Sequence, residues 1–186
     1  SLDANVVLFR ILRRLWRADD QGQPLLALLA GMARDPLLRF TAATILRIRP
    51  GEELGRQDLT DSLIRGTGSR FKEATLDKIV RNAASSWTQS GHLEGRSRKR
   101  RVLVHPRPSV ATFALFLGYV LGLRGRALFD TLWAKALDVS ADELIYIAMD
   151  AKRLGLLDLN SSGGVTEVSF NRLLSPEERR LIHGTD

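Results

Sequence analysis

Apolar side chains recur with a helical period along most of the chain, beginning with residues 3–20. One side of this first segment is apolar and carries Leu8, Ile11, Leu12, Leu15 and Trp16. The other side has arginines at i, i+3, i+4 and i+7, namely Arg10, Arg13, Arg14 and Arg17. The pattern predicts an amphipathic helix with a cationic stripe, followed by a largely apolar helix over residues 24–34.

Residues 36–107 predict three helices and then two short strands. The first two helices are expected over residues 37–47 and 58–64, because Pro50-Gly51 ends the first and the GTGS turn at 66–69 follows the second. The third begins near Lys72. Its apolar positions are Leu76, Ile79, Val80, Ala83 and Trp87. Its opposite side is polar and cationic and carries Lys78, Arg81, Asn82, Ser85 and Gln89.

The period changes to two after Gly91, which predicts a β-hairpin with Leu93, Val102 and Val104 turned toward the core. The sequence between the two strands is strongly basic, with cations at Arg96, Arg98, Lys99, Arg100 and Arg101. Three helices with a polar third helix, followed by a basic hairpin, are typical of a winged helix-turn-helix. The alternative is that the basic run is a solvated loop that protects an edge strand.

Residues 108–174 repeat this design weakly. Three helices are expected, over 111–123, 127–138 and 141–155, and then a hairpin with a Ser-Ser-Gly-Gly turn. The third helix has a mixed outward face, Glu143, Tyr146, Asp150 and Arg153, whose carboxylates would repel phosphate. This module is therefore expected either to brace the first one or to bind protein. A final helix is expected after Ser175, because SPEE is a capping box.

The predicted fold class is mainly α, with N-terminal helices followed by two winged-helix-like modules. The expected division is residues 1–35 for the N-terminal helices, 36–107 for the basic winged helix-turn-helix, 108–174 for the second module and 175–186 for the C-terminal helix and tail. The longest apolar run, residues 110–123, has 14 residues against the roughly 20 that cross a bilayer. We expect a buried helix there and no membrane insertion.

The excess of positive charge lies in the first part of the chain, where we expect a polyanion to bind. Residues 1–107 hold 20 Lys and Arg against 11 Asp and Glu, whereas residues 108–186 hold 8 against 10. Arginine binds phosphate through several planar donors, and asparagine and glutamine can pair with the major-groove edge of adenine. The third helix and the hairpin are therefore expected to bind double-stranded DNA, with the arginines of residues 3–20 adding phosphate contacts or remaining solvated.

Catalysis is not expected. The chain has no cysteine, which excludes disulfides and thiolate metal sites and is compatible with a cytoplasmic location. Its three histidines lack metal-ligand spacing, so no metal or other cofactor is expected. Walker-type glycine loops, nucleophile elbows and dinucleotide motifs are also missing from the sequence. Two alternatives to DNA binding remain: RNA binding through an arginine-rich helix, and a scaffold whose basic surface docks on an acidic protein.

Two segments, SSWTQSGHLEGRSRKRRVLVHP and FALFLGYVLGLRGRALFDTLWAKALD, give the chain a family resemblance. These two segments follow an amphipathic N-terminal helix in the same order as in the small BrxA proteins of bacterial BREX phage-exclusion systems, which the chain therefore resembles. The resemblance implies a helical, DNA-binding protein with winged-helix-like parts that works beside a methyltransferase and a large ATPase. It also leaves RNA open, because that family is similar to an antitermination factor. It implies no particular site residue.

Overall fold

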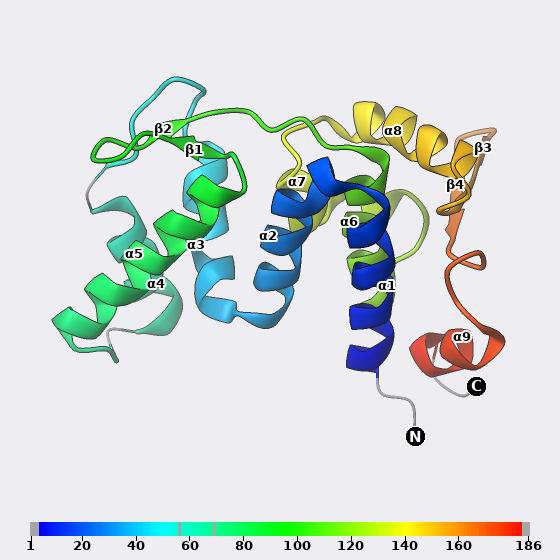
Figure 1. Cartoon of the computed structure of the whole chain (residues 1–186), viewed down its shortest axis with the longest axis horizontal. Helices are drawn as coiled ribbons and strands as arrows, with labels where there is room; N and C mark the ends of the chain where they lie inside the picture. The colour runs from blue at the N-terminus through cyan, green and yellow to red at the C-terminus, as the bar shows by residue number, and fades with distance from the viewer. Residues whose placement is uncertain (1–3, 56, 69, 184–186) are drawn as a thin grey trace. The chain divides into compact units, whose positions relative to one another are not determined.

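The computed structural model describes residues 4–55, 57–68 and 70–183 and is mainly helical, with two small β-hairpins (Figure 1). The chain divides into two compact units. Unit 1 consists of residues 1–26 and 105–186, and unit 2 consists of residues 27–104. Unit 2 is therefore inserted in the sequence of unit 1. This grouping differs from the expected division, because the first helix belongs to the same unit as the C-terminal half of the chain.

Unit 1 is built around one largely apolar helix, α6 (Pro108–Val120), whose residues are buried from Ser109 to Tyr119. α1 (Ala4–Ala18) and α8 (Ala141–Arg153) pack against it, and α9 (Pro176–His183) packs against α1. The expected buried helix in this apolar run is confirmed. No helix in the described ranges combines the length and apolar character that crossing a membrane requires.

The middle of unit 1 differs from the single helix expected over residues 127–138. It forms a 3-10 helix, η2 (Gly125–Asp130), and a short helix, α7 (Leu132–Lys135). The break falls at Thr131, which is extended and whose hydroxyl accepts a hydrogen bond from Ala134 N at 3.1 Å. A threonine that caps a new helix ends the preceding one.

The second hairpin pairs β3 (Asp158–Ser162) with β4 (Val165–Ser169) in antiparallel register, Ser162 opposite Val165. Gly163 and Gly164 form the two-residue turn with φ of 58° and 81°, a conformation that favours glycine. The capping box expected at α9 is confirmed, since Ser175 and Glu178 exchange backbone-to-side-chain hydrogen bonds of 2.8 and 3.2 Å.

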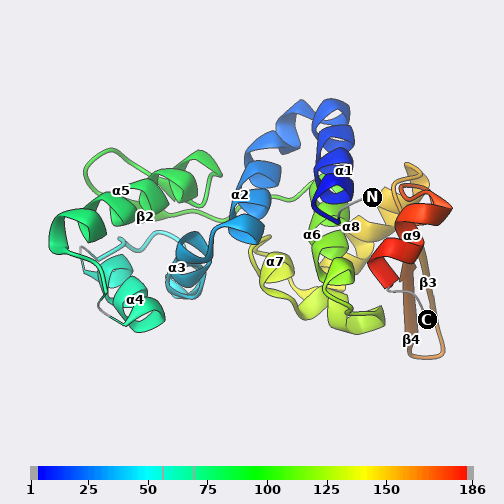
Figure 2. The ribbon, with the colours of Figure 1, turned by 90° about the horizontal axis from the view of Figure 1, so that it is seen from below.

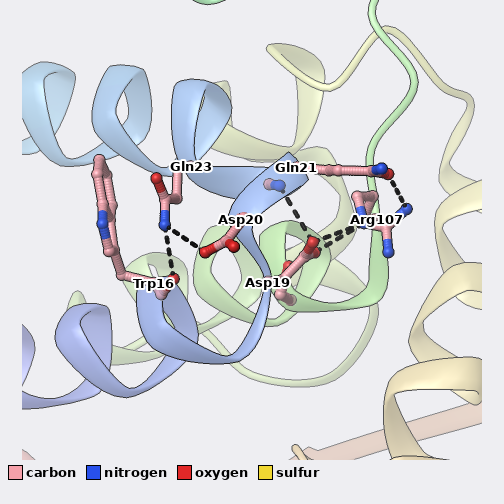
Figure 3. A network of polar contacts seen from close by, with 8 residues as sticks. Trp16, Asp19, Asp20, Gln21, Gln23 and Arg107 are labelled. Carbon is pink, nitrogen blue, oxygen red and sulfur yellow. Dashed lines mark hydrogen bonds and ion pairs between the residues drawn. The ribbon is translucent and has the colours of Figure 1, made fainter.

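A polar network joins the two chain segments of unit 1 (Figure 3). Asp19 caps η1 (Asp20–Gly22) at the end of α1, and its carboxylate contacts Arg107 and Ser109 at the start of α6. Gln21 accepts a further hydrogen bond from Arg107 at 3.0 Å. α2 (Gln23–Arg34) then begins in unit 1 and continues into unit 2.

Unit 2 contains α3 (Pro36–Arg47), α4 (Asp58–Thr67) and α5 (Glu73–Gln89), followed by β1 (Leu93–Glu94) and β2 (Arg100–Arg101). Asp35 starts α3 by accepting a hydrogen bond from Leu37 N at 2.8 Å, with Pro36 in the first turn. The three expected helices and the hairpin are confirmed. Leu93 and Val104 are buried as expected, and Val102 is half-buried.

The turn expected at residues 66–69 begins later than predicted, because Gly66 and Thr67 are the last residues of α4. The helix ends at Gly68. This glycine is left-handed, with φ of 69°, and its N donates to Ile64 O at 2.8 Å, which ends α4. Ser69, the last residue of the expected turn, lies outside the described residues.

A third extended segment adds to the β1–β2 hairpin and was not predicted. Glu53 forms an antiparallel bridge with Arg100, and Leu54 N donates to Lys99 O at 2.8 Å. The backbones of Gly51 and Glu52 form hydrogen bonds of 2.8 and 2.9 Å with that of Arg101. The loop between α3 and α4 therefore forms the outer edge of a small three-segment sheet.

Candidate nucleic-acid interface

All five polar residues predicted on the third helix are exposed on α5: Lys78, Arg81, Asn82, Ser85 and Gln89. The opposite side of α5 buries Ala83 and Trp87, and α5 packs against α3 and α4 through it. Gln89 Nε2 donates to Ser85 Oγ at 2.9 Å, which orders two of the five side chains on the exposed face. The helix therefore presents five hydrogen-bonding side chains to solvent on one face.

A buried polar chain fixes α5 against α3. Trp87 Nε1 donates to Thr41 Oγ1 at 2.8 Å, and Thr41 Oγ1 donates in turn to Leu38 O at 2.6 Å. The ring of His92 lies edge-on to Trp87, 4.9 Å between centroids, and its Nδ1 is 2.8 Å from Ser90 Oγ. Because these donors and acceptors satisfy one another in the core, they hold both the helix and the start of β1 in one position.

The loop that joins β1 to β2, together with β2 itself, presents three exposed cations: Arg96, Arg98 and Arg100. Lys99 is half-buried, and its Nζ donates to Gly95 O at 2.7 Å across the loop. Gly95 has φ of 100°, and a Cβ there would lie 2.1 Å from Arg98 O, so this tight turn requires glycine. Lys99 therefore contributes to the shape of the loop as well as to its charge.

Arg101 is buried, although the prediction placed it on the exposed binding surface. Its residue exposure is 2%, and its Nε donates to Ile45 O, 3.1 Å away near the end of α3. Its guanidinium also donates to the carbonyls of His92 and Val102. Successive side chains of a strand point to opposite faces, so Arg101 of β2 points inward and Arg100 points outward. The guanidinium of Arg101 is further favoured by the carbonyl end of α3, because that end of a helix carries a partial negative charge. Charge in the sequence could not distinguish the two neighbours.

The arginine stripe of α1 lies in unit 1 and is only partly available. Arg10 forms two hydrogen bonds of 2.7 and 2.6 Å with the Glu178 carboxylate and a third, of 2.7 Å, with Leu173 O. The Arg10 guanidinium is therefore engaged within unit 1, although 38% of the side chain is exposed. Arg14 donates to Arg172 O at 3.3 Å, and Arg13, Arg14 and Arg17 are all exposed.

Two further cations next to α5 were not included in the predicted site. Arg70 and Lys72 are exposed in the turn before α5, and the Arg70 guanidinium lies 5.1 Å from the Phe71 ring centroid. Their position at the start of the helix whose polar face was already identified could have revealed them. They extend the positive charge of unit 2 to the N-terminal end of α5.

The hairpin and α5 are neighbours within unit 2. β1 contacts α5, and Figure 2 shows α5 and the β1–β2 loop on the same side of α4. Among the described residues, no group of three or more histidine, aspartate or glutamate side chains could hold a metal ion. The arrangement places exposed cations beside exposed amide and hydroxyl side chains, which are the groups that contact phosphates and base edges in protein–DNA complexes.

No protein-family model matches the chain, and no match was found among curated proteins or solved structures.

Proposed function

We propose that the chain is a non-enzymatic protein that binds double-stranded DNA through unit 2. The observation that carries the proposal is the exposure of Lys78, Arg81, Asn82, Ser85 and Gln89 on one helix that is followed directly by the basic hairpin. Phosphate contacts come from Arg96, Arg98 and Arg100, with Arg70 and Lys72 at the other end of α5. Contacts with base edges come from Asn82 and Gln89.

We assign unit 2 to a winged-helix arrangement. The order of α3, the extended segment at Glu53, α4, α5 and the β1–β2 hairpin supports this assignment, as does the bridge from Glu53 to Arg100. In such a fold the third helix enters the major groove and the loop of the hairpin follows the adjacent backbone. Unit 1 has a comparable order, α6, α7, α8 and β3–β4, but its third helix lacks a cationic face.

The salt dependence of duplex binding tests the proposal. Changing Arg96, Arg98 and Arg100 together to Gln should reduce the slope of log K against log salt by about 2.7, because each phosphate contact contributes roughly 0.9 to that slope. A matched control changes three exposed cations of unit 1, Arg126, Lys135 and Arg180, to Gln. Each variant removes three positive charges, so only a local site makes their slopes differ. Equal slopes in the two variants would contradict the proposed interface.

RNA is the competing ligand, because an arginine-rich helix also binds RNA. Matched duplex DNA, duplex RNA and single-stranded RNA should be compared at one salt concentration. Preference for the DNA duplex is expected. If none of the three is retained at physiological salt, the basic surface of unit 2 docks on an acidic protein instead.

We further propose that the protein works within a phage-defence system of the BREX type, beside a methyltransferase and a large ATPase. The resemblance of two sequence segments to BrxA proteins supports this role. Neighbouring genes for those two enzymes are expected, together with loss of phage resistance when Arg96, Arg98 and Arg100 are changed. If this variant retains full phage resistance, the DNA-binding surface is not required for defence.

A further inference from the structure

The outward face of α8 carries an exposed apolar pair. Tyr146 is 70% exposed and Met149 is 36% exposed. Leu144, Ala148 and Ala151 are buried on the opposite side, where α8 packs on α6 (Figure 1). A tyrosine and a methionine exposed side by side on a helix are typical of a surface that binds another protein.

This face also has an ordered charge pattern. Asp142, Tyr146, Met149 and Arg153 are spaced by four, three and four residues, which is the spacing of one coiled-coil seam. The acid stands at the N-terminal end of the seam and the base at the C-terminal end, with the apolar pair between them. The Asp142 and Arg153 side chains are each 76% exposed.

The seam is complementary to itself when a second copy of the helix runs antiparallel to the first. A two-fold axis midway between positions 147 and 148 brings Asp142 opposite Arg153 of the second copy. The same axis brings Tyr146 opposite Met149 of the second copy. Each contact occurs twice, as a closed isologous interface requires. A parallel arrangement would instead place like charges together.

We propose that α8 is the dimerisation surface of this protein and that its occupant is α8 of a second copy. Asp142 and Arg153 already have partners within the chain, but these partners do not prevent contact with a second copy. Arg126 lies 2.8 Å from Asp142 and Asp150 lies 2.6 Å from Arg153, and all four side chains are exposed, so each pair is readily rearranged or extended. One four-turn helix pair is a small interface, so the dissociation constant should be on the order of 10–100 µM. This dimer does not depend on the proposed DNA binding.

Sedimentation velocity of the full chain over a range of concentrations tests the proposal. A monomer–dimer equilibrium is expected, and Tyr146→Ser should weaken it at least about tenfold because it removes two contacts at the centre of the seam. Val165→Ser is the matched control, since Val165 is 69% exposed at the start of β4 and lies outside the seam. A monomer at about 1 mM, an oligomer larger than a dimer, or equal effects of the two serine variants would overturn the proposal.

A charge exchange tests the antiparallel register. Asp142→Arg alone and Arg153→Asp alone should each weaken dimerisation, because each places like charges opposite one another twice. The double variant Asp142→Arg/Arg153→Asp restores opposite charges across the axis and should recover the dimer. If the double variant is no better than the single variants, the register is wrong and the proposal fails. Circular dichroism of each variant verifies that the fold is retained.

Discussion

Arg107 Nε lies 2.8 Å from both carboxylate oxygens of Asp19, a residue 88 positions earlier in the chain (Figure 3). Ser109 Oγ donates to the same carboxylate at 2.6 Å, and Gly22 N donates at 3.2 Å. A Cβ on Gly22 would lie 2.8 Å from the Asp19 carboxylate and 2.9 Å from Ser109 Oγ. Asp19 therefore joins the segment that leaves unit 1 to the segment that returns to it.

Replacing Asp19 with Ala should destabilise unit 1 by about 1–3 kcal/mol, because the donors of Ser109, Arg107 and Gly22 would be left without their common acceptor. Chemical unfolding measured by circular dichroism gives the free energy of unfolding. Asp20→Ala is the control, since Asp20 is exposed and its carboxylate accepts a hydrogen bond from the neighbouring Gln23 side chain. Equal destabilisation in the two variants would show that the Asp19 network contributes nothing specific.

Acid should weaken unit 1 through two carboxylates. Burial disfavours the charge of Asp19, but hydrogen bonds from Ser109 and Arg107 outweigh burial and lower the pKa of Asp19. Burial likewise opposes the charge of Glu178, and hydrogen bonds from Arg10 and Ser175 lower the pKa of Glu178.

A group whose pKa is lower in the folded state stabilises the fold above its unfolded pKa. The stabilisation is lost as pH falls through the folded pKa. The free energy of unfolding should therefore be steady above about pH 5 and should decrease below about pH 4. The double variant Asp19→Asn/Glu178→Gln should have a flatter acid profile than the unchanged protein, and an unchanged profile would assign the acid sensitivity to other groups.

Arg10 and Arg13 should behave differently although both lie on the stripe of α1. Arg10→Gln leaves the buried Glu178 carboxylate without its guanidinium partner, so it should cost about 1–3 kcal/mol of stability. The double variant Arg13→Gln/Arg17→Gln should unfold like the unchanged protein, because both side chains are exposed.

If Arg13 and Arg17 contact phosphate, the same double variant should reduce the slope of log K against log salt for DNA binding by about 1.8. An unchanged slope would mean that both side chains remain solvated.

The periodicity of the sequence was sufficient to predict most elements of both units. It predicted the buried helix α6, the exposed face of α5 and both hairpins, because each depends on local pattern and turn residues. Contacts between residues that are distant in the sequence could not be predicted from periodicity. The bridge from Glu53 to Arg100 joins separate segments of unit 2. The ion pair of Arg10 with Glu178 spans 168 positions, and the buried Arg101 donates to Ile45 O, 56 positions earlier. The sequence alone does not distinguish an arginine that donates to buried carbonyl groups from one that contacts phosphate.

Arg101 and Arg100 give a direct comparison of these two roles. Arg101→Met should destabilise unit 2 by about 2–4 kcal/mol, because three carbonyl groups would be deprived of a buried donor. Arg100→Met should leave the free energy of unfolding almost unchanged and should lower the salt slope of DNA binding by about 0.9. Hydrogen exchange at the amides of Leu54 and Val102 reports the hairpin directly and should accelerate in Arg101→Met alone. Similar exchange in both variants would mean that Arg101 does not hold the hairpin.

Asn82 and Lys78 should affect DNA binding in different ways, although both are exposed on α5. Asn82→Ala should reduce discrimination at one base pair by about 1–3 kcal/mol, because an amide can pair with adenine in the major groove. Lys78→Gln should weaken binding to all sequences alike and lower the salt slope by about 0.9. Selection from randomised duplexes with each variant separates the two effects, since only the removal of a base-reading side chain changes which sequences are enriched. If Asn82→Ala enriches the same sequences as the unchanged protein, α5 contributes affinity without readout at this position, and any preference must come from Gln89 or from the shape of the duplex.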